Sequence, residues 1–292
     1  MAEFTARGAL PSSAIKADYQ KALTSLVEEM RDSVLWWIKA RYRAREDEIV
    51  VAPEFAQDKS PSRDLEQEIN ELFRQWEKRF DDFAKIRARS FGRRANTNTT
   101  RQLYNAMKEA GLTVRFKNSR RVNNMLQSII AENTGLITSI PRDSMSKVRT
   151  IVMQGVQNGR DMSFIADEIQ ERFKKTRNEA VRIAVDQTNK ATEAISRARC
   201  EDIGVTHGFW MHRSGSKNPR ESHVKMNGKR FKLSEGLYDY SVGYNVKPGE
   251  LIWCRCTFKL DLSTIGAGIA MDNTGRRRLE LPAATIEWGM AA

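Results

Sequence analysis

Apolar residues recur at intervals of three and four positions through roughly the first 200 residues, and this spacing restricts the region to long amphipathic helices. One series predicts a helix over residues 13–46. A second series begins after Pro61, has nearly heptad spacing and ends near Gly92, so we expect that helix to pack against another helix. Shorter helical patterns follow at 100–110, 119–132, 143–157, 161–173 and 177–203. Residues 1–12 are predicted to be loose, and the polar stretch 92–100 to be a loop.

The character of the sequence changes after Gly204. The stretches VTHGFWMH and LIWCRCTFKLDL are rich in branched and aromatic residues with partial alternation, which is typical of strands. Residues 263–292 contain scattered glycines and a run of arginines, and we expect an extended arm there. The predicted fold is a mostly α N-terminal region with long helices, followed by a small α+β C-terminal domain and an extended tail.

Composition narrows the setting in which the chain works. No apolar run approaches the roughly 20 residues that span a bilayer, and the first residues lack the apolar centre of a signal peptide. The cysteine count is 3, an odd number that suits a disulfide framework poorly and favours a reducing compartment. We therefore expect no membrane association, and a protein that is made and used inside a cell or packed into something assembled there.

Positive charge is concentrated in one stretch. The net charge is +12, and residues 83–121 hold eleven Lys or Arg against Glu109 alone, which gives 11 − 1 = +10. Such a cluster indicates a polyanion such as double-stranded DNA, bound without sequence preference, or an acidic face of a partner protein. The alternative is a solvated helix face. The candidate DNA-binding residues are Arg87, Arg89, Arg93, Arg94, Arg101, Arg115, Lys117, Arg120 and Arg121.

Two of the three cysteines, Cys254 and Cys256, flank one arginine. On a regular strand both thiols would face one way and Arg255 the other. With a local bend, the two thiolates could share a structural zinc ion with His223 or His212. The alternative is two small buried residues in the core, with His223 as a hydrogen-bonded residue that fixes the Asn227-Gly228 turn. A disulfide between the two cysteines is near the limit of disulfide geometry.

Four motifs in order resemble a known family. They are the Ala-rich helix of 180–204, the strand GFWM, the pattern R-x-S-H with N-G and an aromatic residue, and P-G-E followed by C-R-C-T. Together they resemble the C-terminal domain of phage head morphogenesis proteins, the family named after Mu protein F, over residues 143–260. The family usually has an Ala-Arg-Thr-Glu segment where this chain has AVDQT at 184–188. The signature residues are Arg220, Ser222, His223, Asn227, Gly228, Pro248, Gly249, Cys254, Arg255 and Cys256.

The resemblance implies a minor capsid protein that acts in bacteriophage head morphogenesis. Such proteins are structural, associate with the portal vertex or capsid interior, and some contact the packaged DNA. It implies a virion location, no enzymatic activity, partners among portal, major capsid or scaffold proteins, and oligomerisation only on assembly. The predicted domains are 1–142, a helical region that contacts portal or DNA; 143–262, the Mu F-like domain; and 263–292, the arm. The tryptophans Trp36, Trp37 and Trp76 are either interface anchors or core residues.

Two other functions stay open from the sequence. A metal-dependent nuclease would use the His and Cys residues, with Glu221 or Asp186 as a possible base. A DNA-binding regulator would use the stretch ARSFGRRANTNTTRQLYNAMKEAG as a helix–turn–helix.

Overall fold

The computed structural model describes residues 4–49, 61–158, 160–214, 218–265, 269–271 and 277–279. Four long helices come first: α1 (Ser13–Ile49), α2 (Pro61–Glu109), α3 (Arg120–Gln157) and α4 (Met162–Asp202). Short strands and one short helix, α5 (Glu221–Met226), follow. The predicted fold class is confirmed. No helix in these ranges combines the length and the apolar content that crossing a membrane requires.

The chain forms two compact units. The bundle unit consists of Lys16–Phe91 and Ile130–Val185, and the sheet unit consists of Met1–Ile15, Gly92–Ile129 and Asp186–Ala292. Each compact unit combines separate stretches of the chain, whereas the predicted domains are continuous stretches of sequence. The domain boundaries predicted at 142 and 262 therefore stay a prediction.

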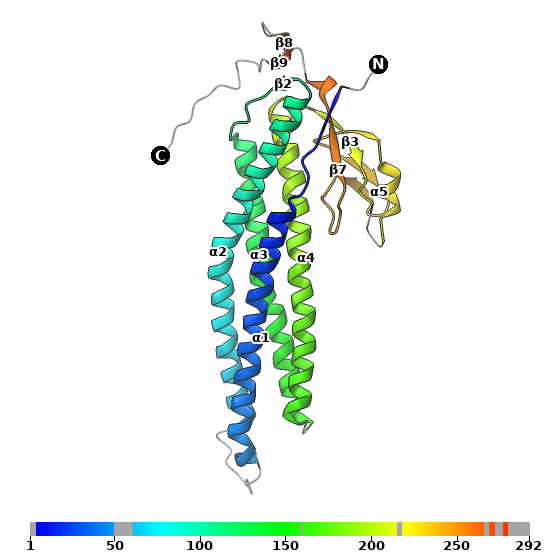
Figure 1. Ribbon diagram of the computed structural model, residues 1–292. Helices are drawn as coiled ribbons and strands as arrows, with labels where there is room; N and C mark the ends of the chain where they lie inside the picture. Colours follow the sequence, from blue (N-terminus) through cyan, green and yellow to red (C-terminus); the bar gives the residue numbers. More distant parts are fainter. Residues whose placement is uncertain are drawn as a thin grey trace. The chain divides into compact units, whose positions relative to one another are not determined.

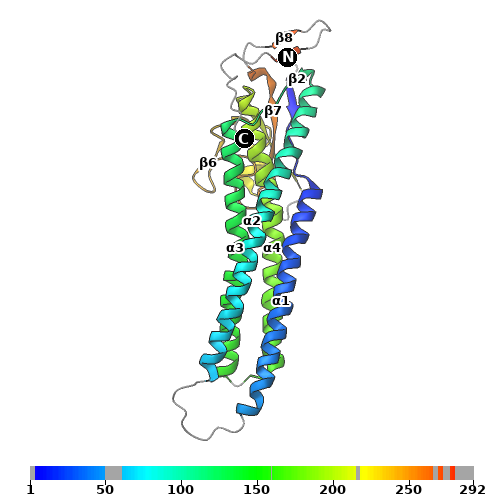
Figure 2. The ribbon, with the colours of Figure 1, turned by 90° about the vertical axis from the view of Figure 1, so that its left-hand side faces the viewer.

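The bundle unit is built from helix faces that bury one apolar stripe each, and its helical segments lie side by side in Figure 1 and Figure 2. Leu23, Met30 and Ile38 recur along α1 and are fully buried. Phe80 of α2 and Phe173 of α4 are among the largest buried side chains. Two buried polar pairs lie among these apolar side chains: the Tyr19 hydroxyl donates to Asn133 Oδ1 at 2.8 Å, and the hydroxyls of Ser144 and Thr176 are 2.9 Å apart. This unit follows directly from the 3.6-residue period of the sequence.

The tryptophans of this unit divide between core and surface. Trp76 is buried and donates its indole N–H to Ser33 Oγ at 3.2 Å, whereas Trp36 is 72% exposed. Trp76 is therefore a core residue and Trp36 a surface residue of the bundle.

The sheet unit contains an antiparallel four-stranded sheet in the order β1-β7-β3-β4. The strands are β1 (Thr5–Arg7), β3 (His207–Met211), β4 (Arg230–Lys232) and β7 (Thr257–Asp261). Figure 1 shows β3 and β7 side by side. Trp210, Phe231 and Phe258 form the aromatic core, with successive edge-to-face contacts at 5.9 and 6.1 Å.

Smaller elements complete the sheet unit. Strands β5 (Leu237–Asp239) and β6 (Tyr244–Val246) form a hairpin, and the 3-10 turn η1 (Leu262–Thr264) follows β7. Strand β2 (Leu112–Thr113) pairs with β9 (Arg277–Leu279), which pairs with β8 (Ile269–Met271). The other residues of the predicted arm beyond Ile265 lie outside the described residues.

Several local predictions were wrong. The helices expected separately at 161–173 and 177–203 form one helix, α4. The expected loop at 92–100 is part of α2, because Ala95, Thr99 and Leu103 continue its buried stripe at helical spacing. The same continuity removes the turn of the proposed helix–turn–helix. Helix α3 continues through Pro141, where a break was expected. The supposedly loose N-terminus supplies β1, whose pairing with β7 is a long-range contact without a local sequence signal.

Candidate metal centre

The two cysteines of the C-R-C motif lie in the loop that leads into β7, not on the predicted strand. Trp253 has a φ of 66°, and the Cys254 N–H bonds to Leu251 O at 2.9 Å, so the chain turns immediately before the motif. The strand begins only at Thr257. The predicted alternation nevertheless holds, since Cys254 and Cys256 are buried and Arg255 is exposed.

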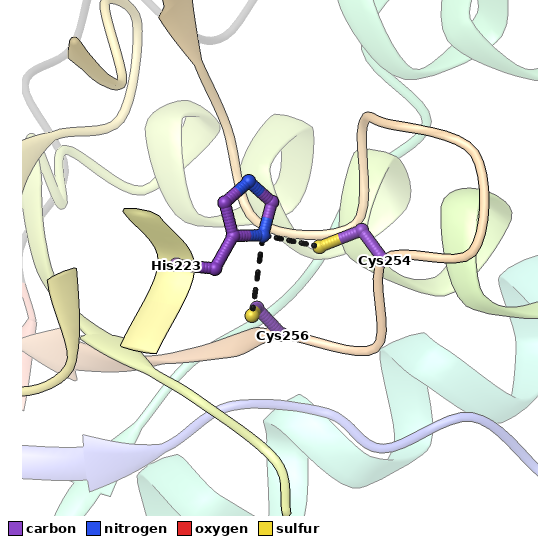
Figure 3. A group of neighbouring side chains, drawn as sticks. All are labelled: His223, Cys254 and Cys256. Atoms are coloured by element: carbon purple, nitrogen blue, oxygen red, sulfur yellow. Dashed lines mark hydrogen bonds between the residues drawn. The ribbon is translucent and has the colours of Figure 1, made fainter. Parts of the chain in front are cut away.

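His223 lies against both thiols. Its Nδ1 is 3.4 Å from Cys254 Sγ and 3.7 Å from Cys256 Sγ. Figure 3 shows the three side chains converging, with the imidazole reaching the cysteines from α5. All three residues are buried, and one donor atom from each lies within 4.8 Å of the others. The structure thus brings together three of the four residues that the sequence suggested as metal ligands.

The other nitrogen of His223 is fixed by Asp239 of β5. His223 Nε2 is 3.0 Å from Asp239 Oδ2, and Asp239 is completely buried. The other carboxylate oxygen accepts from the backbone N–H and the hydroxyl of Ser241, at 2.8 and 2.7 Å. A carboxylate at Nε2 selects the tautomer in which Nδ1 offers a lone pair to the cysteines. Asp239 had no signal in the sequence, because sixteen residues separate it from His223.

His212, which follows β3, lies at the edge of this group. Its Nδ1 is 3.6 Å from Cys256 Sγ, and its backbone N–H donates to Asn227 Oδ1 at 2.9 Å. The Asn227-Gly228 turn was predicted from the sequence. Its asparagine side chain therefore holds the backbone that carries His212.

The three groups also interact through their protons. A hydrogen bond from Cys256 lowers the pKa of Cys254 to about 4, and the proton held between the two sulfurs raises the pKa of Cys256. Burial alone would lower the pKa of His223, but hydrogen bonding to Cys254 and the charges of Cys254 and Asp239 raise it. The arrangement therefore favours a thiolate at Cys254, the form of cysteine that soft metal ions bind.

Helix α4 holds the loop that carries the cysteines. Asp186 Oδ1 accepts the Trp253 N–H at 2.7 Å, which stabilises the unusual backbone there, and Arg197 donates to Pro248 O at 3.0 Å. Gly249 has a φ of 75°, and a β-carbon at this position would lie 2.7 Å from Glu193 Cγ. Burial raises the pKa of Glu193 well above its usual value. Glu193 and Arg197 were not singled out from the sequence.

Residues 146–259 match the family model described as "Phage Mu protein F like protein". The segment is Mu F-like. The match confirms the family that the motifs predicted, and its extent nearly coincides with the predicted 143–260.

Among curated proteins, the chain is similar to an uncharacterized protein of Haemophilus influenzae. The two are 30% identical over 145 residues, which are 50% of this chain and 31% of the relative. The chain thus spans about a third of that protein's length. No solved structure matches the chain.

The other signature residues of the Mu F-like segment support the same site. Arg220 donates to Ile252 O at 2.9 Å, and Ser222 is buried with its hydroxyl 3.5 Å from that of Ser241. The segment 184–188 departs from the family pattern, yet its Asp186 holds the loop. Most of the signature therefore describes one connected structure around the C-R-C loop.

The basic residues predicted to bind DNA are all exposed, but they belong to different parts of the chain. Arg87 and Arg89 lie on α2 in the bundle unit, whereas Arg93, Arg94, Arg101, Arg115, Lys117, Arg120 and Arg121 lie in the sheet unit. Arg121 forms an ion pair with Glu201 at 2.8 Å, so part of its charge is already neutralised. Lys108 belongs to the same basic stretch but was not among the candidate DNA-binding residues, and it is also exposed on α2.

Proposed function

We propose that the chain is a minor head protein of a tailed phage that docks at the portal or capsid interior and contacts packaged DNA without reading its sequence. The family match supports head morphogenesis. The observation that carries the DNA contact is the spacing of Arg94, Arg101 and Lys108. These three exposed cations follow one another at seven-residue intervals on α2.

Seven residues are about two helical turns, so the three cations lie along one face at steps of about 10.5 Å. A duplex carries about one phosphate per 1.7 Å of its axis, so a row of this length faces several phosphates. Arg93, the loop residues Arg115 and Lys117, and Arg120 at the start of α3 add charge in the same unit.

The loop before α3 is held in place by one buried arginine. Arg199 of α4 donates to Lys117 O, to Asn118 Oδ1 at 3.0 Å and to Asn96 Oδ1 of α2 at 3.0 Å. The loop that carries Arg115 and Lys117 is thereby tied to the helix that carries Arg94. Because the loop is already held in place, less conformational entropy is lost when its cations bind DNA.

The test is the salt dependence of binding to a labelled DNA duplex, measured by fluorescence anisotropy. The triple variant Arg94→Ala, Arg101→Ala, Lys108→Ala should bind about tenfold or more weakly, and its log–log salt slope should fall by about 0.9 per lost phosphate contact. The control removes three exposed lysines of the bundle unit, Lys21, Lys39 and Lys147. Equal slopes for the two triple variants would refute the assignment.

For docking to a head protein, the sheet unit offers a second surface, distinct from the row of cations on α2. Tyr238, Tyr240 and Tyr244 of the β5–β6 hairpin are 64%, 56% and 51% exposed, and Ile252 of the cysteine loop is 62% exposed. Aromatic side chains are enriched in protein interfaces, where a few of them supply most of the affinity. We therefore assign the portal or capsid contact to this hairpin.

A pull-down with purified portal, and in parallel with major capsid protein, tests the contact. The variant Tyr238→Ala, Tyr244→Ala should lose about tenfold or more in affinity. The variant Tyr104→Ala, Phe164→Ala changes two other exposed aromatic residues, at 43% and 45% exposure, and should bind normally. Failure of the native chain to bind either protein would refute docking while leaving the DNA contact to be judged on its own experiment.

A further inference from the structure

The donor atoms of the cysteine loop are spaced as a tetrahedral metal ion requires. Zinc bonds of about 2.3 Å to sulfur and 2.05 Å to nitrogen, meeting at the tetrahedral angle, place sulfur and nitrogen about 3.6 Å apart. The three sulfur–nitrogen distances in the cluster are 3.4, 3.7 and 3.6 Å. A hydrogen-bonded thiol needs only one such contact. Here one imidazole nitrogen lies at that distance from two sulfurs.

We propose that Cys254, Cys256, His223 and His212 bind one Zn²⁺ ion as a closed structural site. Thiolate and imidazole ligands select zinc over magnesium or calcium, and two of each make a common structural set. His212 is half-buried and reaches only Cys256 at present, so closing the fourth position needs a side-chain rotation of His212. The three core ligands are already in place.

The support around His223 is that of a metal ligand. Asp239 binds the nitrogen that faces away from the cysteines, at 3.0 Å, and Ser241 holds Asp239 with two hydrogen bonds. Metal-binding histidines nearly always donate their second N–H to such a partner. Trp210 also packs edge-to-face on the imidazole, with the ring centres 5.2 Å apart.

Zinc would join three short segments of the sheet unit. These are the end of β3, helix α5 of only six residues, and the loop before β7. The four proposed ligands come from these three segments, so the ion would hold the segments together. This role also explains why the donors are buried. A nucleophilic cysteine or a hydrolytic metal needs access for a substrate and an open position, and Cys254 is only 3% exposed.

The first test is the metal content of the full chain, purified under reducing conditions and measured by mass spectrometry of the elements. We expect about one zinc ion per chain, released by a thiol-modifying reagent. The variants Cys254→Ser, Cys256→Ser and His223→Ala should lose it. Cys200→Ser and His207→Ala change the remaining cysteine and histidine and should retain it. A native chain without zinc, which also fails to bind it after incubation with excess zinc, would overturn the proposal.

A titration of the native chain with Co²⁺ tests the site even if the variants fail to fold. Binding at the cluster predicts a thiolate-to-cobalt charge-transfer band together with the strong visible bands of tetrahedral cobalt. Octahedral spectra without the charge-transfer band would contradict the site. Asp239→Asn keeps all four ligands and should weaken zinc affinity by about 10–100-fold, whereas unchanged affinity would remove Asp239 from the site.

His212 is tested separately. His212→Ala should still bind about one metal ion, with weaker affinity and an altered cobalt spectrum, because one nitrogen donor is replaced by water. An unchanged spectrum and affinity would exclude His212 as the fourth ligand.

Discussion

The bundle unit and the sheet unit obtain their order from different sources. In the bundle unit, apolar side chains spaced along four long helical segments share the burial. In the sheet unit, the strands have two to five residues, and a few polar groups hold several loops at once. Asp239, Asn227 and Asp186 each fix a different segment around the cysteine loop.

The two units should therefore respond differently to substitutions. A substitution in the bundle unit should cost what the lost side chain buries, in proportion to its size. A substitution in the cysteine loop should cost more than its size suggests, because backbone conformation and close approach are involved there. Comparing the cost of each substitution with the size of the group that it changes separates these cases.

The largest effect is expected from Phe80→Ala in the bundle unit. Phe80 is completely buried and contacts Trp76 edge-to-face at 6.4 Å, so its removal leaves a cavity and should lower the free energy of unfolding by about 3–5 kcal/mol. The matched control is Ile86→Ala on the same helix, where the side chain is 70% exposed and the expected cost is below about 0.5 kcal/mol. Denaturant unfolding gives the free energies, and hydrogen exchange by mass spectrometry shows which unit loosens. Similar costs for the two variants would mean that the buried face of α2 is assigned wrongly.

A smaller loss of unfolding free energy is expected from Gly249→Ala in the sheet unit, but it is large for the size of the change. One methyl group is added, yet it must tolerate a φ of 75° and would lie 2.7 Å from Glu193 Cγ. Left-handed backbone costs about 1–2 kcal/mol and overpacking a further 1–3 kcal/mol, so we expect a loss of about 2–4 kcal/mol. Faster hydrogen exchange of residues 248–256 would locate the damage.

Gly243→Ala is the control for backbone conformation alone. Gly243 has a φ of 83°, but a β-carbon there would meet nothing within 4 Å. It should therefore cost only the conformational part, about 1–2 kcal/mol. If Gly249→Ala costs no more than Gly243→Ala, the packing of Glu193 against the P-G-E turn does not stabilise the loop.

The same contrast explains what the sequence predicted and what it did not. The helices were predicted because helical spacing of apolar residues repeats over dozens of residues. The error at 92–100 arose because threonine and asparagine interrupt the apolar pattern there, although the buried face of α2 continues. The strands were harder, because β1 pairs with β7 across most of the chain and β7 begins only after the turn at Trp253. In the site, residue type and order pointed to Cys254, Cys256 and His223. The sequence did not predict a role for Asp239, Glu193 and Arg197. These residues lie close to the site only in three dimensions, and no spacing in the sequence indicates that proximity.

The smallest effect is expected from Tyr19→Phe, which tests whether buried polar groups matter less in the bundle unit. Tyr19 stacks on Phe91 with ring centres 4.6 Å apart and donates to Asn133 at 2.8 Å, and burial raises the pKa of its hydroxyl. The substitution keeps the stacking and removes one hydrogen bond from a buried asparagine, so we expect a loss of about 1–2 kcal/mol. Tyr238→Phe removes a hydroxyl from a side chain that is 64% exposed, and it should leave the free energy of unfolding unchanged. A loss at Tyr19 as large as that of Phe80→Ala would show that the bundle unit also depends on single polar contacts, and the contrast between the units would fail.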